Sequence, residues 1–221
     1  MNDSTTPRRM IVDGMTFAEI VDVARSDADG LNARIWHEYD KYTAQARKRR
    51  TARPVSFKPL VIPRKSGITW AVRFGSDGAK DFRKWGLTWT LYGLFQYRGG
   101  LWAVYTYGGA WNVSRTKYVY KYALFAPHYF DRYRERQLKD DTRPTVDVVH
   151  EHFKYNSLAV VEHTADGFAC TTEQGTAFGR EENGVYLYLT FVSNDLLFND
   201  QREWRERAIN EIQEYKTLFN K

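Results

Sequence analysis

Three cationic or titratable side chains recur at four-residue spacing between His128 and Arg136, in the string HYFDRYRER. On an α-helix, positions i, i+4 and i+8 lie on one face, so His128, Arg132 and Arg136 would point the same way. Arginine binds phosphate oxygens through paired N–H groups, and histidine titrates near neutral pH. Because like charges four residues apart repel, this face requires either carboxylate partners or a bound anion.

The carboxylate alternative has candidates in the same segment. Glu135 lies three residues after Arg132, and Asp140 lies four residues after Arg136. Pairs at these spacings form readily on a helix surface. The segment is therefore interpreted either as an anion site or as a structural helix face.

A second cationic feature is the run RKRRTAR before Pro54. Its basic residues are Arg47, Lys48, Arg49, Arg50 and Arg53. Basic side chains in a last helical turn complement the helix dipole, which gives a structural interpretation. Clustered Lys and Arg also displace counterions from nucleic acid, so we interpret the run as a candidate nucleic-acid patch.

Charge is distributed unevenly along the 221 residues, whose net charge is +6. Residues 1 to 136 contain 24 Lys and Arg against 12 Asp and Glu, whereas residues 137 to 221 contain nine against 15. Such asymmetry concerns partners and not fold. It favours RNA or another polyanion as a partner of the front half.

The composition and the N-terminus limit the classes of protein. The single cysteine excludes an intramolecular disulfide and a multi-cysteine metal site. No apolar run approaches the length of a membrane span, and the N-terminus lacks the apolar core of a signal peptide. We expect a cytoplasmic protein with no membrane association. His150 and His152 would point apart on a helix, so no metal and no cofactor is expected.

The first half has a helical signal followed by strands. Residues 1 to 14 are polar and predict a poorly ordered start. Thr16 to Glu19 has capping-box spacing, which predicts a helix through Arg25 that ends near residues 27–30, and a second helix is predicted from Leu31 to about Arg50. Aromatic and β-branched runs then predict antiparallel strands near residues 55–62, 68–74, 88–97, 101–107 and 116–125, with a tight hairpin over residues 96–101, whose paired glycines permit positive φ. Their rings are interpreted as core, with a base-stacking platform as the alternative.

The second half repeats this order. Helices are predicted over residues 128–139 and 145–153, strands over 158–164, 167–174 and 185–193, and a charged helix over about 200–219. The chain is therefore predicted to be α+β, with N-terminal helices, an antiparallel aromatic-rich sheet, two mid-chain helices, further antiparallel strands and a C-terminal helix. Residues 15–221 are expected to form one domain, with a possible division into 15–125 and 126–221.

The spacing His128-x-x-x-Arg132-x-x-x-Arg136, followed by a helix and hairpin strands, resembles small toxin-type domains of the RelE and BrnT ribonuclease superfamily. The resemblance covers residues 128–193. Tyr129 stands where those domains often have a small residue.

The resemblance implies metal-independent cleavage of RNA. It would make His128 a general acid or base with His163 as its partner, and Arg132 and Arg136 phosphate ligands. The sequence also permits two other functions: a noncatalytic protein-interaction or assembly module, and a small-molecule-binding domain lined by the aromatic sheet.

Overall fold

The fold is described from a computed structural model. The residues that the structure describes are 10–49, 54–76, 82–83, 86–106, 122–156, 160–164, 167–197, 202–207 and 209–210. They form an α+β protein with a mostly antiparallel sheet, as the sequence predicted. The chain divides into two compact units, which are treated separately below: residues 1–99 with 104–122, and residues 100–103 with 123–221.

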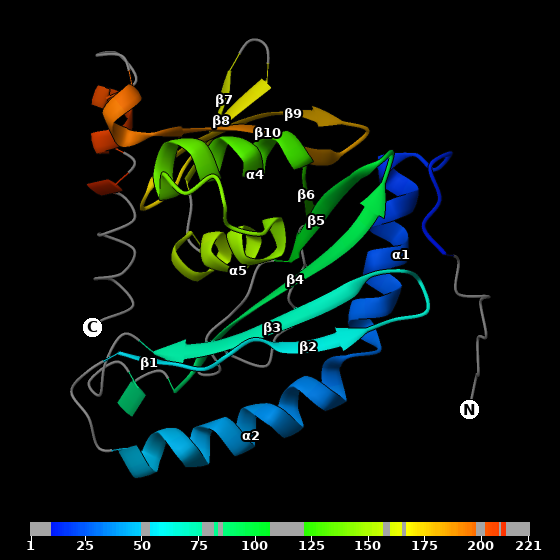
Figure 1. The fold of residues 1–221 in the computed structure, drawn as a ribbon. Helices are drawn as coiled ribbons and strands as arrows, with labels where there is room; N and C mark the ends of the chain where they lie inside the picture. Colours follow the sequence, from blue (N-terminus) through cyan, green and yellow to red (C-terminus); the bar gives the residue numbers. More distant parts are fainter. Residues whose placement is uncertain are drawn as a thin grey trace. The chain divides into compact units, whose positions relative to one another are not determined.

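The first unit has two helices followed by a set of strands (Figure 1). Its elements are α1 (Phe17–Asp29), α2 (Asn32–Arg49), β1 (Val55–Ser56), β2 (Leu60–Pro63), β3 (Thr69–Ser76), β4 (Thr88–Tyr97) and β5 (Gly100–Thr106), of which β5 also contributes to the second unit. The strand order is β1-β3-β4-β5, and β2 also pairs with β3. The capping box at Thr16 and Glu19 is present as predicted, and α1 ends at Asp29, within the range of residues 27–30 where the sequence predicted its end.

Aromatic rings of the first unit form its core, which confirms the packing interpretation. Tyr42 of α2 contacts Phe57 and Phe74, with ring centroids 4.5 and 5.2 Å away. The ring of Trp89 meets Trp36 of α2 at 6.3 Å. Phe74 and Trp89 lie on the same face of paired strands, so this face is the one that α2 covers.

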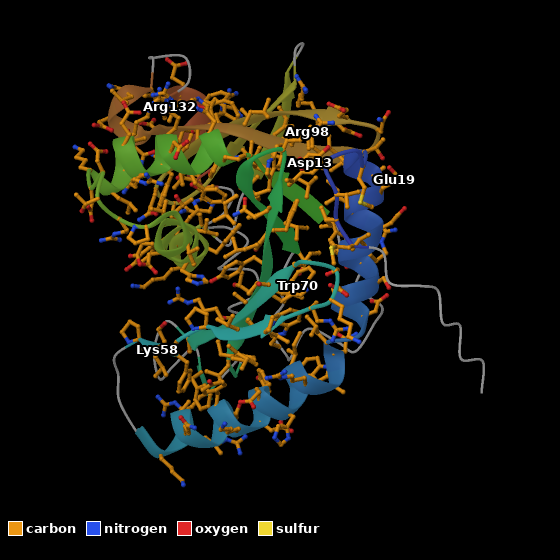
Figure 2. The ribbon with its side chains drawn as sticks, turned by 45° about the vertical axis from the view of Figure 1, so that its right-hand side comes forward. Asp13, Glu19, Lys58, Trp70, Arg98 and Arg132 are labelled. Carbon is orange, nitrogen blue, oxygen red and sulfur yellow. The ribbon has the colours of Figure 1, made fainter. Side chains whose placement is uncertain are left out.

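Segments before α1 join this unit. Ile11 is buried and its amide donates to the carbonyl of Ser66 at 2.9 Å. Asp13 accepts a bond of 2.6 Å from the amide of Arg98, and Figure 2 shows the two residues side by side. Residues 10–14 therefore pack against the unit, where the sequence predicted a poorly ordered start; residues 1–9 lie outside the described chain.

A buried carboxylate links α1 to the β2–β3 hairpin. Asp27 is 2% exposed, accepts a hydrogen bond from Ser66 Oγ, and accepts another from Trp70 Nε1 at 3.4 Å. Arg64 Nε lies 3.6 Å from Asp27 Oδ1. Figure 2 shows Trp70 on the strands beside α1. A buried charge of this kind is tolerated because several donors replace its water.

The second unit contains two short helices and a set of strands. Its elements are β6 (Tyr122–Phe125), α4 (Pro127–Tyr133), the π-helix η1 (Arg134–Leu138), α5 (Thr145–Tyr155), β7 (Val160–Thr164), β8 (Gly167–Thr171), β9 (Gly175–Glu182), β10 (Val185–Ser193) and the short 3₁₀ helix η2 (Asn194–Leu196). The strand order is β6-β10-β9-β8-β7. α4 packs on β10, and α5 packs on α4 (Figure 1). Residues 202–207 are helical, within the predicted C-terminal helix.

A bulge in β10 aligns its aromatic residues with α4. The β9–β10 register shifts between Tyr188 and Thr190. This shift returns Phe191 to the same face as Tyr188, because one extra residue inverts the alternation of side chains. Tyr129 of α4 accordingly meets both rings, at 6.3 and 6.0 Å.

The strands differ from the prediction in two respects. β9 was missed because its sequence GTAFGREE contains two glycines and three charges. β6 pairs with β10 in parallel, which the long intervening chain permits. The predicted hairpin over residues 96–101 is present, although its turn uses Arg98 and Gly99, both at positive φ, and Gly100 already belongs to β5. The helix predicted over 128–139 is present over residues 127–138 and changes to a π-helix at Arg134. Residues 116–121 lie outside the described part.

No helix among the described residues is both long and apolar enough to cross a bilayer.

Replacing Asp27 tests the buried link in the first unit. Asp27→Ala should lower the free energy of unfolding by about 3 kcal/mol, because the partly buried Arg64 would lose its carboxylate partner. Urea denaturation measures the change. Asp22→Ala, which removes an exposed pair with Arg25, is the matched control and should cost under about 1 kcal/mol. Equal losses in the two variants would contradict the assigned role.

Candidate functional site

The predicted helix face is formed for its first two members only. Arg132 Nε donates to His128 Nε2 at 3.2 Å, and Arg132 Nη1 pairs with Glu135 Oε2 at 2.6 Å. His128 is exposed. The histidine ring nitrogen is the acceptor in this contact. The structural alternative for Arg132, pairing with Glu135, is therefore confirmed.

Arg136 leaves that face because the helix changes its pitch. The amide of Lys139 donates to the carbonyl of Arg134 at 2.9 Å, which is the i to i+5 bond of a π-helix. Arg136 Nη1 instead donates to the carbonyl of Phe191 at 2.7 Å. The expected partner Asp140 bonds to Arg143 and Thr142, so the Arg136–Asp140 pairing was wrong.

His163 lies on β7 and is exposed. Its Nε2 is 3.4 Å from the hydroxyl of Tyr186 on β10. No contact between His163 and His128 is present among the described residues. The structure therefore gives each candidate catalytic histidine a separate neighbour.

The basic run is only partly described. Arg47 and Lys48 are exposed at the end of α2, and Arg49 ends that helix. Arg50 and Arg53 lie outside the described residues. The described members are consistent with both the patch and the solvated helix end.

A polar network that the sequence did not reveal lies under α5. His152 is 1% exposed and is surrounded by five aromatic rings with centroids 4.9 to 5.9 Å away. Those rings belong to Phe125, Tyr129, Phe130, Tyr133 and Phe153. Burial lowers the pKa of His152 to about 3, so the ring is neutral at physiological pH.

Both ring nitrogens of His152 have polar neighbours. Nδ1 lies 3.2 Å from Asn156 Nδ2, and Nε2 lies 3.5 Å from the hydroxyl of Tyr129. Asn156 Nδ2 also donates to Gln174 Oε1 at 2.9 Å, and Tyr133 donates to the same oxygen at 2.6 Å. The network joins α4 and α5 to the turn between β8 and β9, which is a structural role. Only the spacing of Val149, His152 and Phe153 on one helix face hinted at it.

Cationic side chains are concentrated in one stretch of the first unit. Residues 41 to 98 contain 14 Lys and Arg and two acidic residues, Asp77 and Asp81. Arg47, Lys48, Lys58 and Lys65 are exposed, and none of these four forms an ion pair with a carboxylate in the described chain.

The second unit differs in this respect. Five of its cations form ion pairs with nearby carboxylates among the described residues. The pairs are Arg132–Glu135, Arg134–Asp131, Arg143–Asp140, Lys154–Glu151 and Arg180–Glu182. Between residues 41 and 98 the described ion pairs are those of Lys41 with Glu38 and of Arg64 with Asp27, and the four exposed cations named above lie outside them.

No family model, curated protein or solved structure matches the chain. The resemblance of residues 128–193 to toxin-type ribonucleases thus rests on its sequence motif alone.

The buried histidine predicts acid lability. In the unfolded chain His152 has a pKa near 6.5, so below that pH the unfolded state binds a proton that the folded state excludes. Stability should fall by about 1.4 kcal/mol for each pH unit below about 6.5, towards the folded pKa near 3, and should be unaffected by this residue above it.

Urea midpoints measured from pH 7.5 to 4.5 would show the effect as the difference between wild type and His152→Gln. His163→Gln, which removes an exposed histidine, should keep the wild-type pH dependence. If the urea midpoint of His152→Gln fell with decreasing pH as steeply as that of the wild type, other groups would be the cause of the acid lability.

Proposed function

We propose that the chain binds RNA through contacts between phosphate groups and the exposed Lys and Arg side chains of residues 41–98, referred to here as the basic segment. The unmatched charge of this segment supports the proposal. Cations without intramolecular carboxylates hold mobile counterions in solution. Releasing counterions from RNA on binding gives a favourable entropy that the ion-paired cations of the second unit would not supply.

The positions of the exposed cations fit this proposal. Arg47 and Lys48 lie at the end of α2, Lys58 lies between β1 and β2, and Lys65 lies in the turn between β2 and β3. All four belong to the first unit. Long basic side chains on helix and strand ends can reach phosphates without moving the backbone that bears them.

Removing the four exposed cations should weaken RNA binding and its dependence on salt. We expect the plot of log K against log salt for a single-stranded RNA to become less steep by about 3 in Arg47→Gln/Lys48→Gln/Lys58→Gln/Lys65→Gln, because each lost contact removes about 0.7. Fluorescence anisotropy between 50 and 200 mM salt would measure the slope.

A matched variant separates this effect from net charge. Arg25, Arg143, Lys154 and Arg180 are all ion-paired, and their replacement by Gln removes the same four charges. This variant should keep a slope close to that of the wild type. The proposal would be refuted if RNA binding by the wild type did not depend on salt concentration. It would also be refuted if the control variant lost as much of the slope as the quadruple variant.

Ribonuclease activity at His128 is a second proposal, and the exposure of His128 beside Arg132 favours it. If it is correct, purified protein in excess EDTA cleaves RNA, and His128→Ala abolishes cleavage while RNA binding by the basic segment persists. Intact RNA with the wild type, or equal cleavage by His128→Ala, would remove His128 from the chemistry. His163→Ala tests the proposed partner in the same assay.

A further inference from the structure

The edge of the first unit's sheet contains an irregularity beside two cations. Ser56 pairs with Gly75, and the amide of Phe57 donates to the carbonyl of Phe74 at 3.1 Å. The register then resumes with Leu60 opposite Val72. Two residues, Lys58 and Pro59, are therefore opposite Arg73, which is the arrangement of a β-bulge.

The bulge decides which side chains face outward. Phe57 and Phe74 both contact Tyr42, so they lie on the face covered by α2. Arg73, the neighbour of Phe74 within β3, consequently lies on the opposite face, since successive side chains of a strand alternate. Lys58 is exposed, and Figure 2 shows it at the end of the strands.

Hydroxyl groups lie beside Arg73. Arg73 Nη2 donates to Ser56 Oγ at 2.5 Å, which orients the guanidinium group towards the sheet edge. Thr90 is paired with Arg73 across β3 and β4, and Thr88 is paired with Gly75. Ser56, Arg73, Thr88 and Thr90 thus share one face of the paired strands, and together with Lys58 of the bulge they are referred to here as the bulged corner.

The corner contains two cationic side chains and has no ionised phenol beside it. Tyr92 lies two residues from Thr90 on the same strand face, and burial raises its pKa well above its usual value of 10.0, although Arg73 acts in the opposite direction. Its hydroxyl is therefore protonated at neutral pH. Lys58 forms no ion pair with a carboxylate among the described residues.

Aromatic side chains suited to base stacking are not exposed here. Among the described residues, the large exposed hydrophobic side chains include a single aromatic one, Tyr155 of the second unit. Trp89, Phe74 and Phe57 are buried on the α2 side. Proteins that bind single strands through their bases use exposed rings as platforms, whereas charge and hydroxyl donors contact the backbone.

We infer that the bulged corner binds the phosphate groups of an RNA backbone and recognises their charge in preference to the identity of the bases. The inference rests on the proposed RNA binding and specifies where and how it occurs. Lys58 supplies a mobile charge, Arg73 supplies an oriented fork of donors, and the hydroxyl of Thr90 is placed to donate to a phosphate oxygen.

The experiment compares two variants that each lose two cations from the basic segment. Labelled 20-nucleotide oligo(U) RNA is titrated at 0.1 M salt with wild type, Lys58→Gln/Arg73→Gln and Arg47→Gln/Lys48→Gln. We expect about tenfold weaker binding when the corner is changed, and a loss of about twofold at the end of α2. Because Arg73 is half-buried, thermal unfolding of each variant is followed, and Lys58→Gln alone should still weaken binding about threefold.

The outcomes separate this inference from the proposed function. Equal losses in the two double variants would show diffuse attraction and overturn the corner site while leaving RNA binding intact. Absence of binding by wild type would refute the proposed function itself. Oligo(A) and oligo(U) should bind within about twofold of each other, and inorganic polyphosphate should compete with both. A strong base preference accompanied by quenching of tryptophan fluorescence would overturn backbone reading.

Discussion

Packing of strand aromatic rings beneath helices is the interaction on which the rest of each unit depends. In the first unit Tyr42 of α2 covers Phe57 and Phe74, and in the second Tyr129 of α4 covers Tyr188 and Phe191. Rings of this size bury a large apolar area and fit in few orientations. They therefore determine which face of each strand is covered, and by alternation which side chains reach solvent.

The same packing explains why each unit contains a bulge. Apolar side chains on both sides of an irregular position can face the same helix only if an extra residue shifts the alternation of the strand. The bulge at Lys58-Pro59 and the register shift between Tyr188 and Thr190 supply that extra residue. In the first unit the bulge contains the exposed Lys58, which the register puts opposite Arg73.

Polar groups that the helices bury are satisfied in different ways. The Asp27 carboxyl group has Arg64, Ser66 and Trp70 as polar neighbours, whereas His152 is neutral within a ring of aromatic side chains. Both groups connect a helix to a turn between two strands. They consequently stabilise the units, and the exposed cations of the basic segment are left available for a partner.

The sequence alone predicted the α+β class, the capping box, β4, β10 and the concentration of positive charge, because these follow from local period, capping residues and composition. It could not predict the π-helix that turns Arg136 towards Phe191, the strand β9, or the burial of His152. Nor did it show that five cations of the second unit form ion pairs while, among the described residues, Arg47, Lys48, Lys58 and Lys65 of the basic segment form none. These features depend on contacts between residues far apart in the chain, and local propensity carries no information about such contacts.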